Sequence, residues 1–196
     1  SISGRAFNEC TGLTNITIPN SVISIGREAF SGCTGLTNIS IPNSVTSIEG
    51  DTFSCCTGLT SITIPNSVTS IDEQAFYVCT GLTSVTIPNS VTSIDYRAFY
   101  DCEGLTNITI PDTVTSIGLD AFDGTRWYNA KPDGLIYINK VSYEYKGTMP
   151  SNTKIDIIPG TVSISGRAFN ECTGLTNITI PDSVTSIGNS AFSGCT

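Results

Sequence analysis

The chain has 196 residues, a formal net charge of −8 and only 13% charged residues, about half the charged share of an ordinary soluble domain. The acidic balance and the lack of any Lys/Arg cluster argue against binding to nucleic acid or to an anionic membrane surface, and no apolar run is long enough to span a bilayer. The chain contains no histidine, which excludes Ser-His-Asp and Cys-His nucleophile pairs and metal sites that contain histidine.

A repeat of 23 residues organises the chain, and a fixed period of this length is typical of stacked-repeat proteins. Proline and cysteine follow the period, and phenylalanine follows it in two series, which are Phe7, Phe30, Phe53, Phe76, Phe99 and Phe122, then Phe169 and Phe192. The unit is A-F-x-x-C-T-G-L-T-x-I-T-I-P-N-S-V-T-S-I-x-x-x. Residues 163–196 copy residues 1–34 except at four positions. This duplication predicts an array that continues past both ends of the segment.

Each repeat holds three short elements, as the second copy illustrates. The stretch "REAFSGC", residues 27–33, is too short for a real helix and is expected to form a helical or 3₁₀ turn that directs Ala29 and Phe30 inward. The stretch "LTNISIP", residues 36–42, alternates apolar and polar residues and favours a strand, which its proline ends because proline cannot donate to a ladder. "PNS" then predicts a turn, and "VTSI", residues 45–48, a second short strand.

A single coil cannot bury its apolar side chains alone, whereas stacked coils cover one another. The inward set of one coil is Ala29, Phe30, Cys33, Leu36, Ile39, Ile41, Val45 and Ile48. The sequence therefore predicts a repeat solenoid, β-rich with short helical or 3₁₀ turns, in which 23-residue coils stack as parallel strands. Residues 1–196 are expected to form one such solenoid, a fragment of a longer array, with stability that is cooperative along the stack.

The recurring "CTGLTNITIPNSVTSI" and "AF" elements, over residues 1–125 and 153–196, resemble the BspA-type leucine-rich repeat family. The resemblance implies a curved leucine-rich repeat solenoid with parallel strands along its axis. It also implies a place on surface or secreted proteins of host-associated microbes, where some members are adhesins for host matrix proteins. The family fixes no ligand-binding residues by a motif, so none is carried over to this chain.

Residues 126–152 break the pattern and fill the place of one coil. The stretches "GLIYI", "NK" and "VSYEYKG" in succession predict a β-hairpin. This segment also holds the only tryptophan, the only methionine and four of the seven tyrosines of the chain. Three interpretations stay open, which are a degenerate coil with a small aromatic core, a protruding partner site, and a hinge that changes the curvature of the solenoid.

Seven of the eight cysteines occupy one slot of the repeat. Stacked coils lie about 4.8 Å apart, so these side chains form a column and point the same way. This favours buried free thiols that pack as small apolar residues, with occasional disulfides as the alternative. Without a C-x-x-C pair or a base, a metal or catalytic role is disfavoured. Cys55 lies outside the column and is expected to be exposed and open to oxidation.

Two pairs of residues vary among the copies, one before "AF" and one after it, so packing does not dictate their identity. Tyrosine is enriched at interfaces because its ring is apolar and its hydroxyl forms hydrogen bonds. Tyrosines fall in these slots in adjacent coils, and further aromatic residues follow in the irregular segment. One aromatic patch is the candidate ligand-binding site; its residues are Tyr77, Tyr96, Tyr100, Trp127 and Tyr128. The alternative is neutral sequence variation, scattered over a solvated face.

Polar residues of the first strand form an outward column, interpreted as a solvated ladder, with ice or glycan binding as the alternative. Its members are Thr17, Ser40, Thr63, Thr86, Thr109 and Thr179. Asp72, Glu73 and Asp95 carry oxygen ligands of the kind that Ca²⁺ prefers, but no D-x-D-x-D-G loop appears. No metal and no cofactor is therefore predicted.

These observations predict a non-catalytic module for protein–protein interaction and adhesion. By the family resemblance, it is expected on an extracellular or cell-surface protein, where it would bind a host protein such as fibronectin or fibrinogen. The alternative is a structural spacer that presents another domain. Since both ends of the stack are uncapped, end-to-end self-association is also expected.

Overall fold

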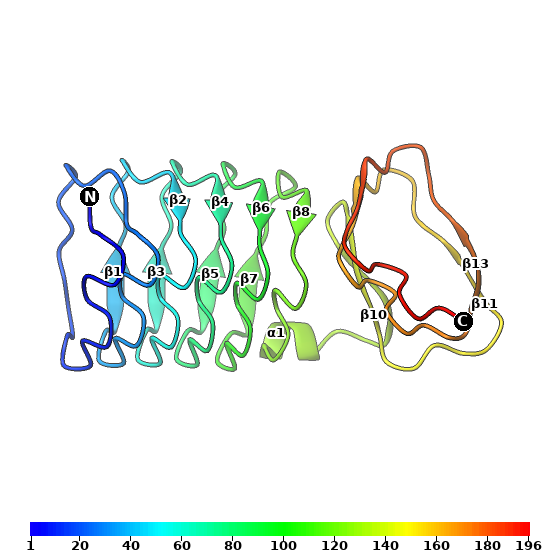
Figure 1. Cartoon of the computed structure of the whole chain (residues 1–196), viewed down its shortest axis with the longest axis horizontal. Coiled ribbons are helices and arrows are strands. Elements are labelled where there is room, and N and C mark those ends of the chain that lie inside the picture. Colours follow the sequence, from blue (N-terminus) through cyan, green and yellow to red (C-terminus); the bar gives the residue numbers. More distant parts are fainter.

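The computed structural model describes residues 1–196 and shows a row of stacked coils (Figure 1). The first strands of the coils are β1 (Asn38–Ser40), β3 (Ser61–Thr63), β5 (Ser84–Thr86) and β7 (Asn107–Thr109). β1 pairs in parallel with β3, where Ile39 lies beside Ile62, and β5 pairs in parallel with β7. Second strands form one four-stranded parallel sheet of β2 (Ser47–Ile48), β4 (Ser70–Ile71), β6 (Ser93–Ile94) and β8 (Ser116–Ile117). The predicted solenoid of stacked 23-residue coils is confirmed.

Alternation along the first strand decides which side chains enter the core. Ile39 and Ile41 are buried, whereas Ser40 between them is exposed, because successive side chains of a strand point to opposite faces. The carbonyl of Pro42 accepts the N–H of Val45 at 3.0 Å and closes the turn that follows. Both strands and this turn therefore lie where the repeat predicts them.

The stretch expected to form a helical turn takes another conformation. We call residues 27–33 and their equivalents in other coils the turn run. Alternate residues of the run donate their N–H groups to the carbonyl three residues earlier at 3.1 Å, but left-handed residues at Glu28 (φ 58°) and Gly32 (φ 74°) interrupt a helical path. The N–H groups between them donate to the next coil instead, at 3.1, 2.9 and 2.8 Å. A ladder of hydrogen bonds therefore joins successive turn runs.

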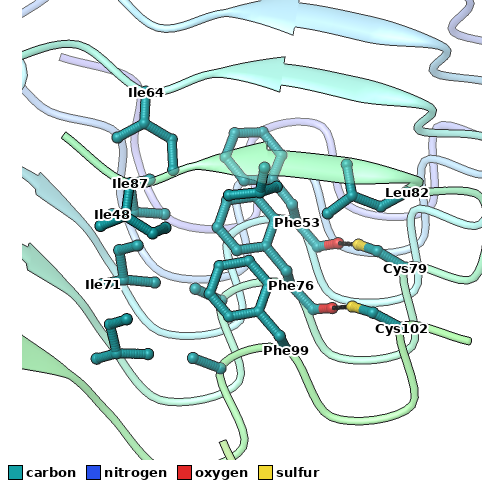
Figure 2. Packing of buried hydrophobic residues seen from close by; sticks show 14 of the residues in the cluster. Ile48, Phe53, Ile64, Ile71, Phe76, Cys79, Leu82, Ile87, Phe99 and Cys102 are labelled. Atoms are coloured by element: carbon teal, nitrogen blue, oxygen red, sulfur yellow. Dashed lines mark hydrogen bonds between the residues drawn. The ribbon is translucent and has the colours of Figure 1, made fainter. Parts of the chain in front are cut away.

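The phenylalanines form a column through the core (Figure 2). Phe53 lies 5.6 Å from Phe30 and 5.5 Å from Phe76 between ring centroids, with nearly parallel planes, and all three side chains are fully buried. Burial of such a side chain stabilises a fold by roughly 1.5–3 kcal/mol. Because each ring is covered by the rings of adjacent coils, this stabilisation exists only in the stack.

Five of the seven thiols in the cysteine column are buried and free, as predicted, whereas Cys10 in the first coil is exposed and Cys195 in the last coil is half-buried. Cys79 Sγ donates to the carbonyl of Phe53 at 3.0 Å, and Cys102 Sγ donates to the carbonyl of Phe76 at 3.0 Å (Figure 2). Thr125 occupies the next slot of the column, where its hydroxyl donates to the carbonyl of Phe122 at 2.7 Å. The thiols thus act as small wall residues that join one coil to the next.

Residues 126–152 contain the predicted hairpin and the only helix, α1 (Arg126–Asn129). With four residues, α1 is far too short to span a bilayer. The hairpin consists of β9 (Gly134–Ile138) and β10 (Val141–Lys146) in antiparallel pairing. One set of its side chains joins a core of 38 buried residues, namely Ile136, Ile138, Val141 and Tyr143. Another set packs against a second core of seven buried residues, namely Leu135, Tyr137 and Tyr145. The hairpin therefore separates two cores.

The ladder between turn runs is interrupted at this hairpin. Each earlier phenylalanine donates its N–H to a backbone carbonyl of the next coil, whereas Phe122 donates to the hydroxyl of Tyr143 at 3.2 Å. The N–H of Gly124 donates to the carboxylate of its neighbour Asp123 at 2.9 Å, and the N–H of Asp120 has no partner. The hairpin thus replaces only part of the missing turn run.

Two further coils follow, with strands β11 (Thr153–Asp156), β12 (Ser163–Ile164), β13 (Leu175–Thr179) and β14 (Ser186–Ile187). Strands β12 and β14 extend the sheet of the hairpin, in the order β14-β12-β10-β9. The hydroxyls of Ser163 and Ser165 donate to carbonyls of Thr115 and Ile117 at 2.6 and 2.8 Å, which ties these coils to the first stack. Figure 1 shows the later coils opened toward the viewer and the earlier coils edge-on, so the stacking direction changes at the hairpin.

Candidate interaction surface

Three of the five candidate residues lie together on the turn runs. The rings of Tyr77 and Tyr100 stack with centroids 5.5 Å apart and 11° between their planes. The guanidinium carbon of Arg97 lies 4.9 Å from the ring centre of Tyr96 and 4.7 Å from that of Tyr100. Arg97 Nε donates to the carboxylate of Asp120 at 3.1 Å, which holds the cation against both rings. We call Tyr77, Tyr96, Arg97 and Tyr100 the tyrosine cluster.

In the tyrosine cluster, the rings of Tyr77 and Tyr100 cover one another, so part of the surface of each ring is shielded from solvent. All side chains of the cluster are half-buried. The nearby carboxylate of Asp101 raises the pKa of Tyr100, so this phenol stays protonated and can donate a hydrogen bond at neutral pH. Since contacts within the cluster already order its side chains, a partner would lose little conformational entropy on binding there.

Trp127 and Tyr128 do not belong to this cluster. Trp127 packs edge-on against Phe122 with ring centroids 5.2 Å apart, and Lys131 Nζ lies 4.1 Å from the tryptophan ring centre. Tyr128 is only 4% exposed, and its hydroxyl donates to Glu144 at 2.6 Å. The expectation of one continuous aromatic patch is therefore wrong. These rings close the end of the phenylalanine column, because the next coil has no phenylalanine to cover Phe122.

Backbone geometry constrains the variable slots even though packing leaves their side chains free. One residue of each pair has a positive φ, for example Gln74 at 55° and Val78 at 57°. Glycine in the slot after "AF", as at Gly32 and Gly124, is the sequence signal for this conformation. Cys55 occupies the same slot with φ 58° and is half-buried rather than exposed, and the hydroxyl of Ser54 donates to its Sγ at 3.7 Å.

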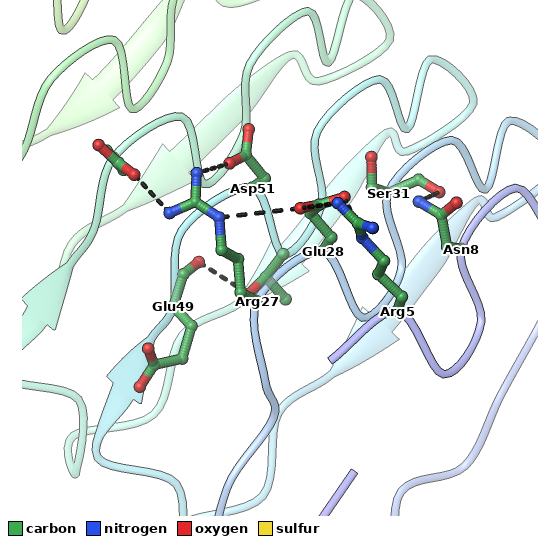
Figure 3. Close-up of polar contacts among 9 residues, drawn as sticks. Arg5, Asn8, Arg27, Glu28, Ser31, Glu49 and Asp51 are labelled. Carbon is green, nitrogen blue, oxygen red and sulfur yellow. Dashed lines mark hydrogen bonds and ion pairs between the residues drawn. The ribbon is translucent and has the colours of Figure 1, made fainter. Parts of the chain in front are cut away.

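A chain of ion pairs crosses the turn runs near the N-terminus, and the sequence interpretation misses it (Figure 3). Arg5 contacts Glu28 at 2.8 Å, and Arg27 contacts Asp51 at 2.6 Å and also pairs with Glu73. The available signal is opposite charge about one period apart for Arg5–Glu28 and Arg27–Asp51, and two periods apart for Arg27–Glu73. Exposed pairs of this kind contribute about 0–1 kcal/mol each. They therefore set the distribution of charge on this surface and add little to the stability of the fold.

The polar column of the first strands lies on a separate, charge-free surface. All of its members are exposed, as predicted. Two shallow hollows of about 390 and 420 Å³ meet at Thr63, and asparagine, serine, threonine, proline and isoleucine side chains line them without any charged residue. This surface can offer hydroxyl and amide hydrogen bonds to an uncharged partner.

The cysteines do not have the features of nucleophiles. Burial raises the pKa of Cys56 to about 12 and that of Cys172 to about 11, so these thiols stay protonated at neutral pH. No group of three or more cysteine, aspartate or glutamate side chains is arranged to hold a metal ion. Burial therefore makes Cys56 and Cys172 poor nucleophiles at neutral pH.

Comparisons with known proteins agree with this architecture. A family model described as BspA type leucine rich repeat region matches six copies, over residues 1–128 and 137–196. The crystal structure of a leucine-rich repeat protein from Bacteroides ovatus matches with a TM-score of 0.59 and 25% identity, over 100% of this chain and 62% of that chain. The T. pallidum leucine rich repeat protein matches with a TM-score of 0.57 and 25% identity, over 89% of this chain and 70% of that chain. No curated protein sequence matches the chain.

Proposed function

Because the chain belongs to the BspA-type leucine-rich repeat family, we propose that it is a non-catalytic adhesion module of a cell-surface or secreted protein. Its partner would be a host extracellular protein such as fibronectin or fibrinogen. Stacked repeats suit this role, since they present extended surfaces at positions that the core does not dictate. The chain spans 62% of the Bacteroides ovatus protein that it resembles, so further parts of a longer protein would contribute anchoring.

The tyrosine cluster is the observation that supports a binding role most directly. It places three tyrosines and one arginine in neighbouring coils, in slots where the repeat demands no particular side chain. Tyrosine and arginine are also the residue types most enriched at interface hot spots.

Surface plasmon resonance against fibronectin, fibrinogen and collagen tests the proposal. The wild type would run beside the triple variant Tyr77→Ala, Tyr96→Ala, Tyr100→Ala. A matched control is Thr63→Ala, Thr86→Ala, Thr109→Ala, which changes the charge-free strand surface. We expect saturable binding by the wild type and the threonine variant, and at least about 10-fold weaker binding by the tyrosine variant, as for loss of a hot spot. The reverse ranking would move the site to the strand surface.

A structural spacer is the second candidate function, and the continuous phenylalanine column favours it. Rings from Phe7 to Phe122 stack at 5.0–5.7 Å between adjacent coils, a continuous core that suits a spacer. A spacer would show no saturable binding to any of the three matrix proteins. That outcome would overturn the adhesion proposal and favour the spacer function.

A further inference from the structure

A small cleft lies where the two stacks meet at the hairpin. Its volume is about 200 Å³, which is enough for one side chain. Its walls come from the last turn run of the first stack, from β10 and from the first turn run after the hairpin. We call it the seam cleft; its lining residues are Leu119, Asp120, Tyr143, Glu144, Tyr145, Gly166, Arg167 and Asn170.

Backbone groups on two of these walls lack hydrogen-bond partners. In the preceding coil, the N–H equivalent to that of Asp120 donates across the ladder, from Arg97 to Leu119 at 3.0 Å. In the seam cleft the N–H of Asp120 and the carbonyl of Gly166 both remain unpaired. One hydrogen bond between the hairpin and the next turn run is present, from the N–H of Tyr145 to the carbonyl of Ala168 at 2.7 Å. The ladder of hydrogen bonds between turn runs is therefore incomplete beside the cleft.

The carboxylate of Glu144 lines the cleft and forms no ion pair. One of its oxygens accepts from the hydroxyl of Tyr128 at 2.6 Å. Lys146 on the same strand is already engaged, since its Nζ donates to carbonyl oxygens of α1 and the residues after it at 3.3, 2.9 and 2.6 Å. Burial raises the pKa of Glu144, which reflects the cost of a charge in this place.

Arg167 is the only basic residue of the lining, and it is exposed at the rim. Its counterpart in the N-terminal copy, Arg5, pairs with Glu28 at 2.8 Å. The duplicate carries Ser190 at the position of Glu28, so Arg167 has no acidic residue to hold it. Its charge is solvated and does not neutralise the half-buried carboxylate.

From these observations we propose that the seam cleft binds a lysine or arginine side chain of a protein partner. A lysine ammonium has three donors, which match the carboxylate of Glu144, the carbonyl of Gly166 and the one carboxylate oxygen of Asp120 that does not accept from Arg97. Tyr143 and Tyr145 line the same cleft and provide apolar contact for the aliphatic stem of such a side chain. The net charge of −8 attracts basic partners from a distance. The inference rests on the proposed adhesion function and adds the chemistry of one anchoring residue.

An NMR titration with Nα-acetyl-lysine amide tests this site. The expected result is saturable shifts of the backbone amide signals of Asp120 and Gly166. The matched control ligand is Nα,Nε-diacetyl-lysine amide, which has the same stem without the charge and is expected to give no saturable shift. Equal shifts with the neutral ligand would overturn the proposal.

Three variants sharpen the test. Glu144→Gln keeps an acceptor for Tyr128 and should weaken binding at least about 10-fold, as for loss of a charge-assisted hydrogen bond. Arg167→Gln removes the like charge at the rim and should tighten binding about 2–3-fold. Glu103→Gln, an exposed acid of the first stack, should leave it unchanged. Unaltered binding by a folded Glu144→Gln variant would also overturn the proposal. The Arg167→Gln variant gives a second readout that leaves the half-buried Glu144 unchanged.

The outcomes separate this inference from the proposed function. Matrix-protein binding without any response to the lysine ligand would remove the cation site alone. A saturable lysine site without binding to fibronectin, fibrinogen or collagen would remove that choice of partner and retain the cation site.

Discussion

The coils before and after the hairpin have the same repeat but differ in packing. Before the hairpin, stacked phenylalanines run through a core of 38 buried residues. After it, only Phe169 and Phe192 stack, 5.1 Å apart, beside a core of seven. Three of the exposed large apolar residues also lie there, namely Ile158, Ile180 and Ile187. The difference shows that a coil owes its stability to the neighbours that cover it, more than to its own sequence.

The hairpin between the two regions shows what a stack needs to continue. It supplies side-chain groups where regular coils supply backbone groups, as Tyr143 does for the N–H of Phe122. Where regular coils place a stacked phenylalanine, Tyr143 of the hairpin and Trp127 of α1 make edge-on contacts with Phe122. The stacks remain in contact, but the ladder of the turn runs does not pass through.

The largest expected effect contrasts one phenylalanine from each region. Phe76→Ala removes a fully buried ring between two others, so we expect a loss of about 3–5 kcal/mol in the free energy of unfolding. Phe192→Ala removes a half-buried ring at the end of the second stack and should cost less than half as much. Urea titrations followed by circular dichroism measure both. Equal losses would mean that the two regions are stabilised alike.

A smaller effect is expected at the junction. Tyr143→Phe keeps the ring but leaves the N–H of Phe122 without its acceptor in a buried place, which should cost about 1–3 kcal/mol. The control is Tyr137→Phe, since the hydroxyl of Tyr137 accepts from the exposed Ile158 N–H, which water can satisfy. Thermal melting of the two variants gives the comparison, and similar stability losses would contradict the role assigned to Tyr143.

The turn run should behave alike in both regions, because its left-handed residues recur on both sides of the hairpin. Val78 has φ 57°, a conformation unfavourable for a β-branched residue. Val78→Gly is therefore expected to stabilise the protein by about 0.5–1 kcal/mol, after the entropic cost of glycine. The reverse change Gly32→Val, in the same slot of another coil, should destabilise it. A loss of stability in Val78→Gly, measured by urea titration, would show that packing of Val78 outweighs strain.

The smallest effect concerns pH at the junction. Burial raises the folded-state pKa of Glu144 above its ordinary value of 4.5, so the folded protein holds this proton more tightly than the unfolded chain. The contribution of Glu144 to stability is therefore greatest below pH 4.5, falls as pH rises to the folded pKa, and is constant above it.

Glu144→Gln removes this dependence, so its stability relative to the wild type should rise between pH 4 and the folded pKa. Urea midpoints at a series of pH values measure it. Asp51 and Asp72 of the first stack also have pKa values raised by burial. Both proteins contain these residues, so their contributions to the pH dependence of stability cancel in the difference between the two curves. Parallel curves for the two proteins would contradict the assignment.

The repeat alone predicted the strands, the phenylalanine column and the thiol column, because each depends on a period that neighbouring coils share. It did not predict the conformation of the turn run, since the left-handed residues at Gln74, Val78 and Arg97 are not residue types that signal it. The tyrosine cluster was predicted in part. Slot positions bring Tyr77 and Tyr100 together, but the burial of Tyr128 depends on how the hairpin folds against Phe122.

The duplicated segments, residues 1–34 and 163–196, separate the two contributions most clearly. Local sequence determines the turn-run backbone in both, since Glu9 and Glu171 have φ values of 58° and 56°. Burial differs, because Cys10 is exposed and Cys172 is buried. Sequence by itself thus determined the shape of one coil, which depends on interactions within 23 residues. The tertiary structure decided which coils are covered, where the ladder stops and which polar groups are left to bind a partner, because these depend on segments that are distant in the chain.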